Sequence, residues 1–212
     1  MKLLRYKEGL ALPEYLQIEQ HLVREVKEPT LFTWIVAPTV IYGRHQSAEV
    51  EVNEPYCREH GIQIVQRKSG GGCVYADQGN LMISFVTPST HSEQAFALFL
   101  AFLREALAAK GLPAVTTAHN DILVNGRKVS GCASYTCPTG TIVHSTLLFD
   151  VNLDAMINAI TPTTEKLAKH GVASVRQRVA NLKELTDVFA DIHELRTYIE
   201  SYGNKFTGAI DA

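Results

Sequence analysis

The sequence predicts an α+β fold, with a core of mixed or antiparallel β-sheet packed against helices. Apolar runs typical of strands follow one another in pairs, whereas doubly wound folds alternate strands regularly with helices. Asn125-Gly126 separates two such runs, and this dipeptide favours the type I′ turn of a β-hairpin. Because 212 residues suit one domain with a substantial core, we expect a single domain over 1–212.

The predicted strands are short and mostly apolar. They are expected at 2–6, 31–36, 39–42, 62–65, 81–86, 122–124, 127–134 and 142–151. Pro138-Thr139-Gly140 predicts a second turn, which joins the last two of these strands. Cys73-Val74-Tyr75, directly after three glycines, also looks extended.

Apolar residues at helical spacing predict the helices. We expect them at 12–27, 54–60, 92–110, 153–160, 164–170 and 191–206. The segment 92–110 is apolar on most sides, so it should lie buried against a sheet. Ser92 is expected to cap its first turn and Gly111 to end it.

The overall composition excludes several classes of protein. A formal charge of −2 gives no general attraction to nucleic acid or to anionic membranes, so we expect neither as a partner. The most apolar segment, 95–109, contains Arg104 and Glu105 and is too short to span a bilayer. Four cysteines without a recognisable secretory signal indicate reduced thiols and a cytoplasmic protein.

The most informative stretch is Gln66-Arg67-Lys68-Ser69-Gly70-Gly71-Gly72-Cys73. Glycines remove Cβ atoms and permit positive φ, so backbone N–H groups can close around an anion beside the two cations. The alternative is a tight turn with a solvated Arg-Lys pair. The stretch lacks the Lys-Ser/Thr pair of a phosphate loop and the helix of a dinucleotide fingerprint. If it binds phosphate, it does so through another architecture.

A second block, 120–131, contains the hairpin and Lys128. A lysine on this strand, followed by Gly131, could hold a carboxylate and the charge that develops when it is activated. The alternative is a solvated hairpin lysine, because lysine is seldom buried.

Other candidates have ordinary alternatives. His144 lies within a β pattern and is more often structural than catalytic there, and Arg176 and Arg178 can be a solvated edge. A zinc site from Cys132, Cys137, His119 and His144 fits known spacings poorly. Cys73 or Cys132 could act as a nucleophile with His144 as base, although the sequence does not place His144 beside either thiol.

Taken in order, these blocks resemble the lipoate–protein ligase A family of the biotin/lipoate protein ligase superfamily. The matching motifs are Arg67-Lys68-Ser69-Gly70-Gly71-Gly72-x-Val74-Tyr75-x-Asp77-x-Gly79-Asn80, Asn120-Asp121, Gly126-Arg127-Lys128-Val129-Ser130-Gly131-x-Ala133, His144-x-Thr146-Leu147-Leu148, and Lys166-Leu167-Ala168 through Gly171 to Ser174-Val175-Arg176-x-Arg178-Val179. The resemblance covers about residues 29–185 and implies a biotin/lipoate protein ligase-like catalytic domain.

The resemblance implies an activity. Family members condense lipoate or octanoate with MgATP to an acyl-adenylate, then transfer the acyl group to a lysine of an apo lipoyl domain. Such domains occur in the E2 subunits of 2-oxoacid dehydrogenases and in the glycine-cleavage carrier protein. We expect ATP and Mg²⁺ as cofactors, lipoate as substrate, and no metal held by the protein itself.

The resemblance also implies roles for particular residues. Lys128 is expected to be the catalytic group, acting as an electrostatic stabiliser. Contacts with ATP or the adenylate are expected from Arg67, Gly71, Gly72, Cys73, Val74, Tyr75, Asn120, Asp121, Lys128 and Arg176. Contacts with lipoate are expected from Gly71, Lys128, Ser130, Gly131 and His144.

The sequence departs from the family pattern at Ala76, Val143-His144-Ser145 and Cys132, where the family commonly has His, His-His-Gly and Ser. These changes put the acyl-chain preference in question. Many bacterial ligases carry a further C-terminal domain, so one alternative to the full ligase is a chain that needs an accessory subunit to activate free lipoate, or that transfers only a preformed acyl group. A further alternative is an ATP-independent octanoyl- or lipoyl-transferase that uses a cysteine thioester. The non-enzyme alternative is a ligand-binding or carrier-docking module that keeps the pocket without turnover.

Overall fold

The computed structural model describes residues 1–160 and 178–207. A seven-stranded sheet forms its centre, in the order β1-β2-β6-β10-β9-β8-β7. Its strands are β1 (Lys2–Leu3), β2 (Thr30–Trp34), β6 (Asn80–Thr87), β7 (Ala114–Thr116), β8 (Asp121–Val124), β9 (Arg127–Cys137) and β10 (Gly140–Leu148). β1 and β2 are parallel, and every other pair is antiparallel. The predicted α+β class with a mixed sheet is confirmed.

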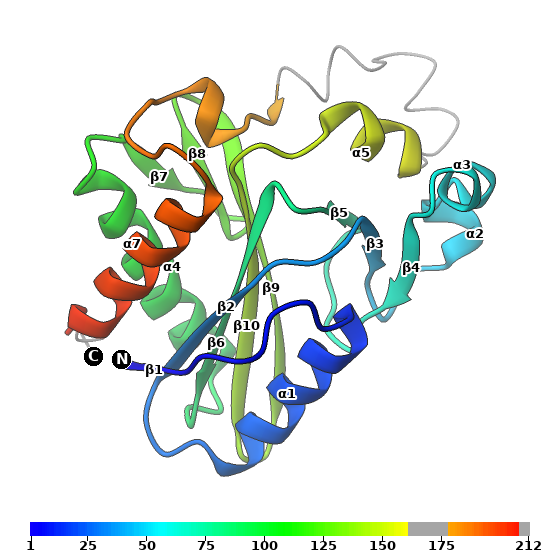
Figure 1. Cartoon of the computed structure of the whole chain (residues 1–212). Helices are drawn as coiled ribbons and strands as arrows, with labels where there is room; N and C mark the ends of the chain where they lie inside the picture. The colour runs from blue at the N-terminus through cyan, green and yellow to red at the C-terminus, as the bar shows by residue number, and fades with distance from the viewer. Residues whose placement is uncertain (161–177, 208–212) are drawn as a thin grey trace.

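Helices cover both faces of this sheet (Figure 1). The helices α4 (Ser92–Ala108) and α7 (Ile192–Lys205) share one apolar core with side chains of the central strands, including Phe85 and Val143. The helix α1 (Leu12–Glu25) packs on the opposite face against Trp34, Met82 and Ile142. This second face is the one that bears the candidate site.

A smaller sheet lies beside the large one, in the order β4-β3-β5. It consists of β3 (Thr39–Tyr42), β4 (Gln63–Gln66), parallel to β3, and β5 (Val74–Ala76), antiparallel to β3. The helices α3 (Glu54–Glu59) and α5 (Leu153–Ala159) contribute to its core, and α2 (Ala48–Glu51) lies nearby (Figure 1). The glycine-rich stretch is therefore the loop that joins two strands of the small sheet.

Most predicted elements are present, with some corrections. Asn125 and Gly126 have φ values of 51° and 76°, so the predicted hairpin turn is confirmed. Ser92 does not cap its helix: it is the first helical residue, and His91 occupies the cap without a side-chain hydrogen bond. The short elements α2, β7 and a 3₁₀ turn at Leu182–Glu184 were not predicted. The helix expected at 164–170 lies outside the described residues.

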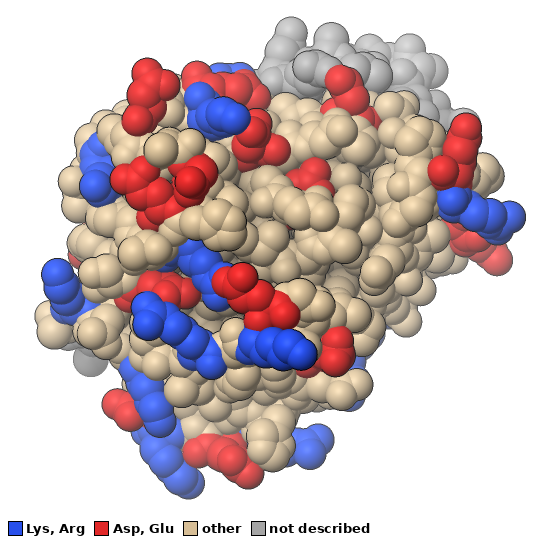
Figure 2. All heavy atoms as spheres, in the orientation of Figure 1, with Lys and Arg blue, Asp and Glu red and all other residues tan. Residues whose placement is uncertain are grey.

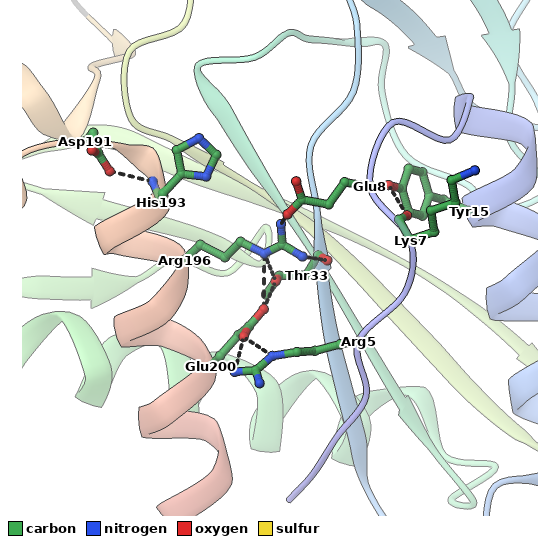
Figure 3. A network of polar contacts seen from close by, with 9 residues as sticks. All are labelled: Arg5, Lys7, Glu8, Tyr15, Thr33, Asp191, His193, Arg196 and Glu200. Atoms are coloured by element: carbon green, nitrogen blue, oxygen red, sulfur yellow. Dashed lines mark hydrogen bonds and ion pairs between the residues drawn. The ribbon is translucent and has the colours of Figure 1, made fainter.

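Helix α7 is attached to β2 and the N-terminal segment through a network of ion pairs (Figure 3). Glu200, whose side chain is 6% exposed, accepts hydrogen bonds from Thr33 Oγ1 at 2.6 Å, Arg196 Nε at 3.1 Å and Arg5 Nε at 3.0 Å. Arg196 also pairs with Glu8. These contacts join the two ends of the chain.

The distribution of surface charge and the lengths of the helices are as the composition predicts. Over much of the face shown in Figure 2, positive and negative side chains are interspersed. None of the helices in the described part of the chain combines the length and apolar composition that a membrane-spanning helix requires.

Candidate functional site

A cavity of about 290 Å³ opens between the glycine-rich loop, α1 and the hairpin β8–β9. Its polar wall combines residues from the loop with residues from β8, β9 and β10, and Val74 of β5 adds an apolar side chain. Its apolar wall comes from α1, β2, β3 and β6. The lining residues are Leu12, Leu16, Trp34, Ile41, Arg67, Gly71, Gly72, Cys73, Val74, Met82, His119, Asp121, Lys128, Gly131, Cys132, Ala133, His144, Ser145 and Thr146.

Lys128 is on the wall of this cavity, together with Gly71 and Gly72 of the loop. Its side chain is 38% exposed, and Nζ lies 2.8 Å from Oδ1 of Asp121. A Cβ atom on Gly131 would lie 2.9 Å from both Cε and Nζ of Lys128, so the lysine side chain folds closely over this glycine. Lys128 is thus partly solvated, but it borders the same cavity as the loop.

Arg67 is buried and holds the glycine-rich loop in its conformation. Its Nη2 donates hydrogen bonds to the carbonyls of Gly70 and Gly72, each at 2.7 Å, and its Nη1 donates to that of Ile41 at 3.0 Å. Burial lowers the pKa of the guanidinium from its ordinary value. Gly71, at the apex, has φ of +89°, which favours glycine. The loop conformation therefore depends on Arg67 as well as on the glycines.

Lys68 does not join Arg67 at the cavity, contrary to the expectation of two cations at one place. Its ammonium contacts Oε1 of Gln20 on α1, and its side chain does not border the cavity. The loop therefore presents glycine backbone to the cavity, and the largely buried Arg67 is the charged residue of the loop that lines it.

Several other expected site residues do not border the cavity. Tyr75 is buried; burial and the neighbouring Asp77 raise the pKa of its hydroxyl. Ser130 is fully buried, and its Oγ lies 2.8 Å from that of Ser145. Asn120 precedes Asp121 in a turn, with φ of 60°. Arg176 lies outside the described residues.

The chain returns to Lys128 immediately after 161–177. Val179 forms a parallel bridge with Lys128, and the Ala180 amide donates to the Lys128 carbonyl at 3.0 Å. Before that segment, Ile160 bridges to Val52. The C-terminal end of the motif that includes Arg178 is thus fixed beside the lysine.

Two thiols, Cys73 and Cys132, line the cavity. Burial raises the pKa of Cys73 to about 12 and that of Cys132 to about 11. His144 is not available to either thiol as a base, since its Nε2 lies 2.6 Å from Ser69 Oγ and its Nδ1 lies 3.2 Å from Glu19 Oε2. The arrangement is therefore unfavourable for a cysteine nucleophile.

The residues considered as zinc ligands, Cys132, Cys137, His119 and His144, do not form a metal-binding group. Within 1–160 and 178–207, no three His, Cys, Asp or Glu side chains are grouped closely enough to hold a metal ion. His119, considered from sequence only as a zinc ligand, instead lines the cavity with Asp121 and Lys128.

Sequence reasoning missed the apolar wall and Glu19. Trp34 is the only tryptophan of the chain, yet its strand gave no reason to link it to the loop. Glu19 did give a signal, because it occupies the helical stripe formed by Leu12, Tyr15 and Val23. An acid on an apolar stripe indicates a buried partner, which here is His144.

Comparisons with known proteins match most of the chain to one family. Residues 5–202 match the sequence profile of the lipoyl protein ligase A/B catalytic domain. The chain is 35% identical, over 187 residues, to the lipoate-protein ligase LplJ of Bacillus subtilis, a match that covers 87% of this chain and 56% of that protein. The chain thus spans little more than half the length of these curated lipoate-protein ligases.

Solved structures show the same architecture. A bi-partite lipoate protein ligase from Thermoplasma acidophilum, studied with its E2 lipoyl domain, superposes with a TM-score of 0.86 at 27% identity, covering 96% of this chain and 82% of that one. A lipoate-protein ligase A bound with ATP gives a TM-score of 0.81 at 26% identity, with 96% and 84% of the two chains covered.

Proposed function

Because the chain belongs to the lipoyl protein ligase A/B catalytic domain family, we propose that it activates lipoate or octanoate with MgATP and transfers the acyl group to a lysine of an apo lipoyl domain. The observation that supports this most directly is the shared cavity. It brings the Lys128 ammonium and the backbone of Gly71 and Gly72 to one space with an apolar wall. A fatty acid and a triphosphate require such a combination if their reacting ends are to meet.

The acyl chain lies along the apolar wall in this proposal. Leu12, Leu16, Trp34 and Met82 supply apolar surface, and Lys128 and His144 are polar residues that line the same cavity. A volume of about 290 Å³ is just below the roughly 300–1,000 Å³ usual for ligand pockets, which suits a small acyl acid. The nucleotide is then held next to the glycine-rich loop.

Activation joins a carboxylate oxygen to the α-phosphorus of ATP while the bond to pyrophosphate breaks. Both reactants are anionic, so Lys128 reduces their repulsion and stabilises the charge that develops on the phosphoryl oxygens. The positive φ at Gly71 favours glycine, and because glycine has no side chain, the loop amides stay open to an approaching phosphate in this proposal. Asp121 is the only carboxylate among the described lining residues, so it is the group that fits the Mg²⁺ of the nucleotide.

Transfer follows when the acceptor lysine amine attacks the acyl carbon and AMP leaves. The amine loses a proton in this step, and the nucleophile comes from the partner, so the protein needs no nucleophile of its own. We propose the lipoyl domains of 2-oxoacid dehydrogenase E2 subunits or the glycine-cleavage carrier protein as acceptors. The E2 lipoyl domain studied with the archaeal relative supports this class of partner.

A second proposal concerns the activation step. The similarity to a bi-partite ligase supports a requirement for an accessory subunit when the substrate is free lipoate. In that case the chain alone transfers a preformed acyl group.

One experiment tests both proposals. The pure chain is incubated with lipoate, MgATP and an apo lipoyl domain, and the mass of the acceptor is followed. A parallel reaction starts from synthetic lipoyl-AMP. Modification in both supports the full ligase, and modification from lipoyl-AMP alone supports the accessory requirement. No modification in either reaction contradicts the proposed function.

A further inference from the structure

A chain of buried polar side chains joins α1 to the glycine-rich loop. Glu19 of α1 is 3% exposed at its side chain, and its Oε2 lies 3.2 Å from Nδ1 of His144 on β10. The Nε2 of the same imidazole lies 2.6 Å from Oγ of Ser69, in the loop. Three segments that are far apart in sequence are thus connected through two short contacts.

This series of hydrogen-bonded side chains continues beyond Ser69 and beyond Glu19. In the loop, Ser69 Oγ accepts a hydrogen bond from Nε of Arg67 at 3.0 Å, and Arg67 holds the loop carbonyls. On the other side, Glu19 Oε1 accepts from Ser84 Oγ at 2.6 Å, and Ser84 accepts from Trp34 Nε1 at 2.8 Å. A continuous path therefore runs from the apolar wall of the cavity to the loop backbone.

The donors at the two ends determine where the hydrogens lie. Trp34 can only donate, so the Ser84 hydroxyl is turned to donate to Glu19. The Glu19 carboxylate only accepts, which assigns a proton to Nδ1 of His144.

The hydrogens at the loop end of the series are assigned in the same way, from the donors and acceptors present. Arg67 donates to Ser69 Oγ and leaves the hydroxyl hydrogen of Ser69 available, and in the arrangement that we infer this hydrogen points to Nε2 of His144. Every donor and acceptor is then used with His144 in its Nδ1–H tautomer.

The side-chain contacts Ser69–His144–Glu19 follow the Ser–His–acid order of a hydrolytic triad, but Ser69 cannot act as a nucleophile here. Ser69 is 2% exposed, does not border the cavity, and already accepts from Arg67. A nucleophile must reach its substrate. The chain of contacts therefore fits the holding of a structure better than covalent chemistry.

We propose that Glu19 and Ser69 are positioning residues for acyl-adenylate formation, acting through His144 to fix the glycine-rich loop. Three consecutive glycines have many accessible conformations, so a loop that must present its amides to a phosphate gains from external support. This inference rests on the proposed function. It adds that α1, which supplies part of the acyl wall, also sets the loop that faces the nucleotide.

The test is Glu19→Gln, which preserves shape. The amide can keep its carbonyl towards Ser84, but its NH₂ then faces Nδ1 of His144 and makes that nitrogen an acceptor. The imidazole proton moves to Nε2, so Ser69 Oγ must accept from both His144 and Arg67, and the Ser69 hydroxyl hydrogen loses its acceptor. We expect the ¹⁵N shifts of His144 to change from the Nδ1–H to the Nε2–H tautomer. Lipoate-dependent pyrophosphate exchange should fall at least about tenfold.

The control is Glu25→Gln, the same change at an exposed position of the same helix. It should leave both the tautomer and the exchange rate unchanged. Ser69→Ala should also lose activity, and Glu19→Gln/Ser69→Ala should be no worse than the more impaired single variant, because both act through one chain.

Three outcomes would overturn the inference: full exchange in Glu19→Gln, an Nε2–H tautomer in the unmodified protein, or additive effects in the double variant. A failure of the proposed function looks different. The unmodified chain would then show no exchange, with or without an accessory subunit, while the Nδ1–H tautomer would still be observed.

Discussion

The ammonium of Lys128 lies 2.8 Å from the carboxylate of Asp121, across the two strands of one hairpin. The side chain reaches Asp121 by passing over Gly131, which pairs with Asp121 in the strand register. The ion pair with Asp121 holds the Lys128 ammonium at the cavity wall. An entering carboxylate or phosphate can replace Asp121 as the partner of this ammonium. This arrangement leads to the first two predictions.

Lys128→Ala should abolish acyl-adenylate formation and leave the protein folded. The side chain is 38% exposed, so its removal opens no core cavity, but it removes the cation that faces the reacting charges in the proposed reaction. We expect lipoate-dependent pyrophosphate exchange to fall by about 10²–10³-fold, the loss typical of removing one such stabilising group. Lys183→Ala, which removes an exposed lysine paired with Asp150, is the matched control. Retained exchange in Lys128→Ala would refute the role.

Gly131→Ala should impair the same step without unfolding the protein. The new Cβ would lie 2.9 Å from Cε and Nζ of Lys128, and these atoms are the flexible end of the lysine. The lysine therefore moves and the backbone stays. We expect about a 10- to 100-fold loss of pyrophosphate exchange, because small displacements of positioned groups are costly.

A double variant decides whether Gly131 acts through the lysine. If it does, Gly131→Ala/Lys128→Ala should be as active as Lys128→Ala alone. A further loss in the double variant would mean that Gly131 has a separate role, such as direct approach of its backbone to substrate.

How far the sequence predicts this site depends on the range of each interaction. The hairpin that carries Lys128 is determined by local turn chemistry, and Asn125-Gly126 predicts it directly. The glycine-rich loop is likewise visible as a motif. Arg67 illustrates the limit, because sequence suggests a free cation and the structure shows one that donates to loop carbonyls.

The apolar wall and the polar chain beneath it depend on tertiary packing. Glu19 and His144 are 125 residues apart in sequence, and they meet only because α1 packs across β10 and β6. Helical periodicity predicts which face of α1 is buried, but it does not specify the strand residue opposite Glu19. The strand register supplies that information, since it places Ser84 directly opposite His144.

The thiols give a prediction about pH. Burial raises the pKa of Cys73 to about 12 and of Cys132 to about 11, so both remain protonated at pH 8, where only a thiolate reacts. The pKa of Cys137 is lowered, because hydrogen bonds from Thr139 and the Gly140 amide outweigh its burial. Iodoacetamide at pH 8, read by peptide mass, should label Cys137 first, and labelling of the other two should increase only as the pH approaches 11–12.

The same thiols test the cysteine-thioester alternative. Cys73→Ala/Cys132→Ala should retain lipoylation of an apo lipoyl domain, since neither thiol has His144 as a base. Cys137→Ser should remove the fast labelling phase. Rapid labelling of Cys73 or Cys132 at pH 8, together with loss of acyl transfer in the double variant, would favour the transferase mechanism.

The ion-pair network around Glu200 should be important for stability (Figure 3). Glu200→Ala leaves the Thr33 hydroxyl and the Arg196 guanidinium, which is 12% exposed, without their buried acceptor. Removing one partner of a buried pair typically lowers the free energy of unfolding by about 3–5 kcal/mol. Arg5→Ala removes a 70% exposed partner of the same carboxylate and should cost no more than about 1 kcal/mol. Urea unfolding at a constant m-value measures both changes, and equal losses would show that the pair is not effectively buried.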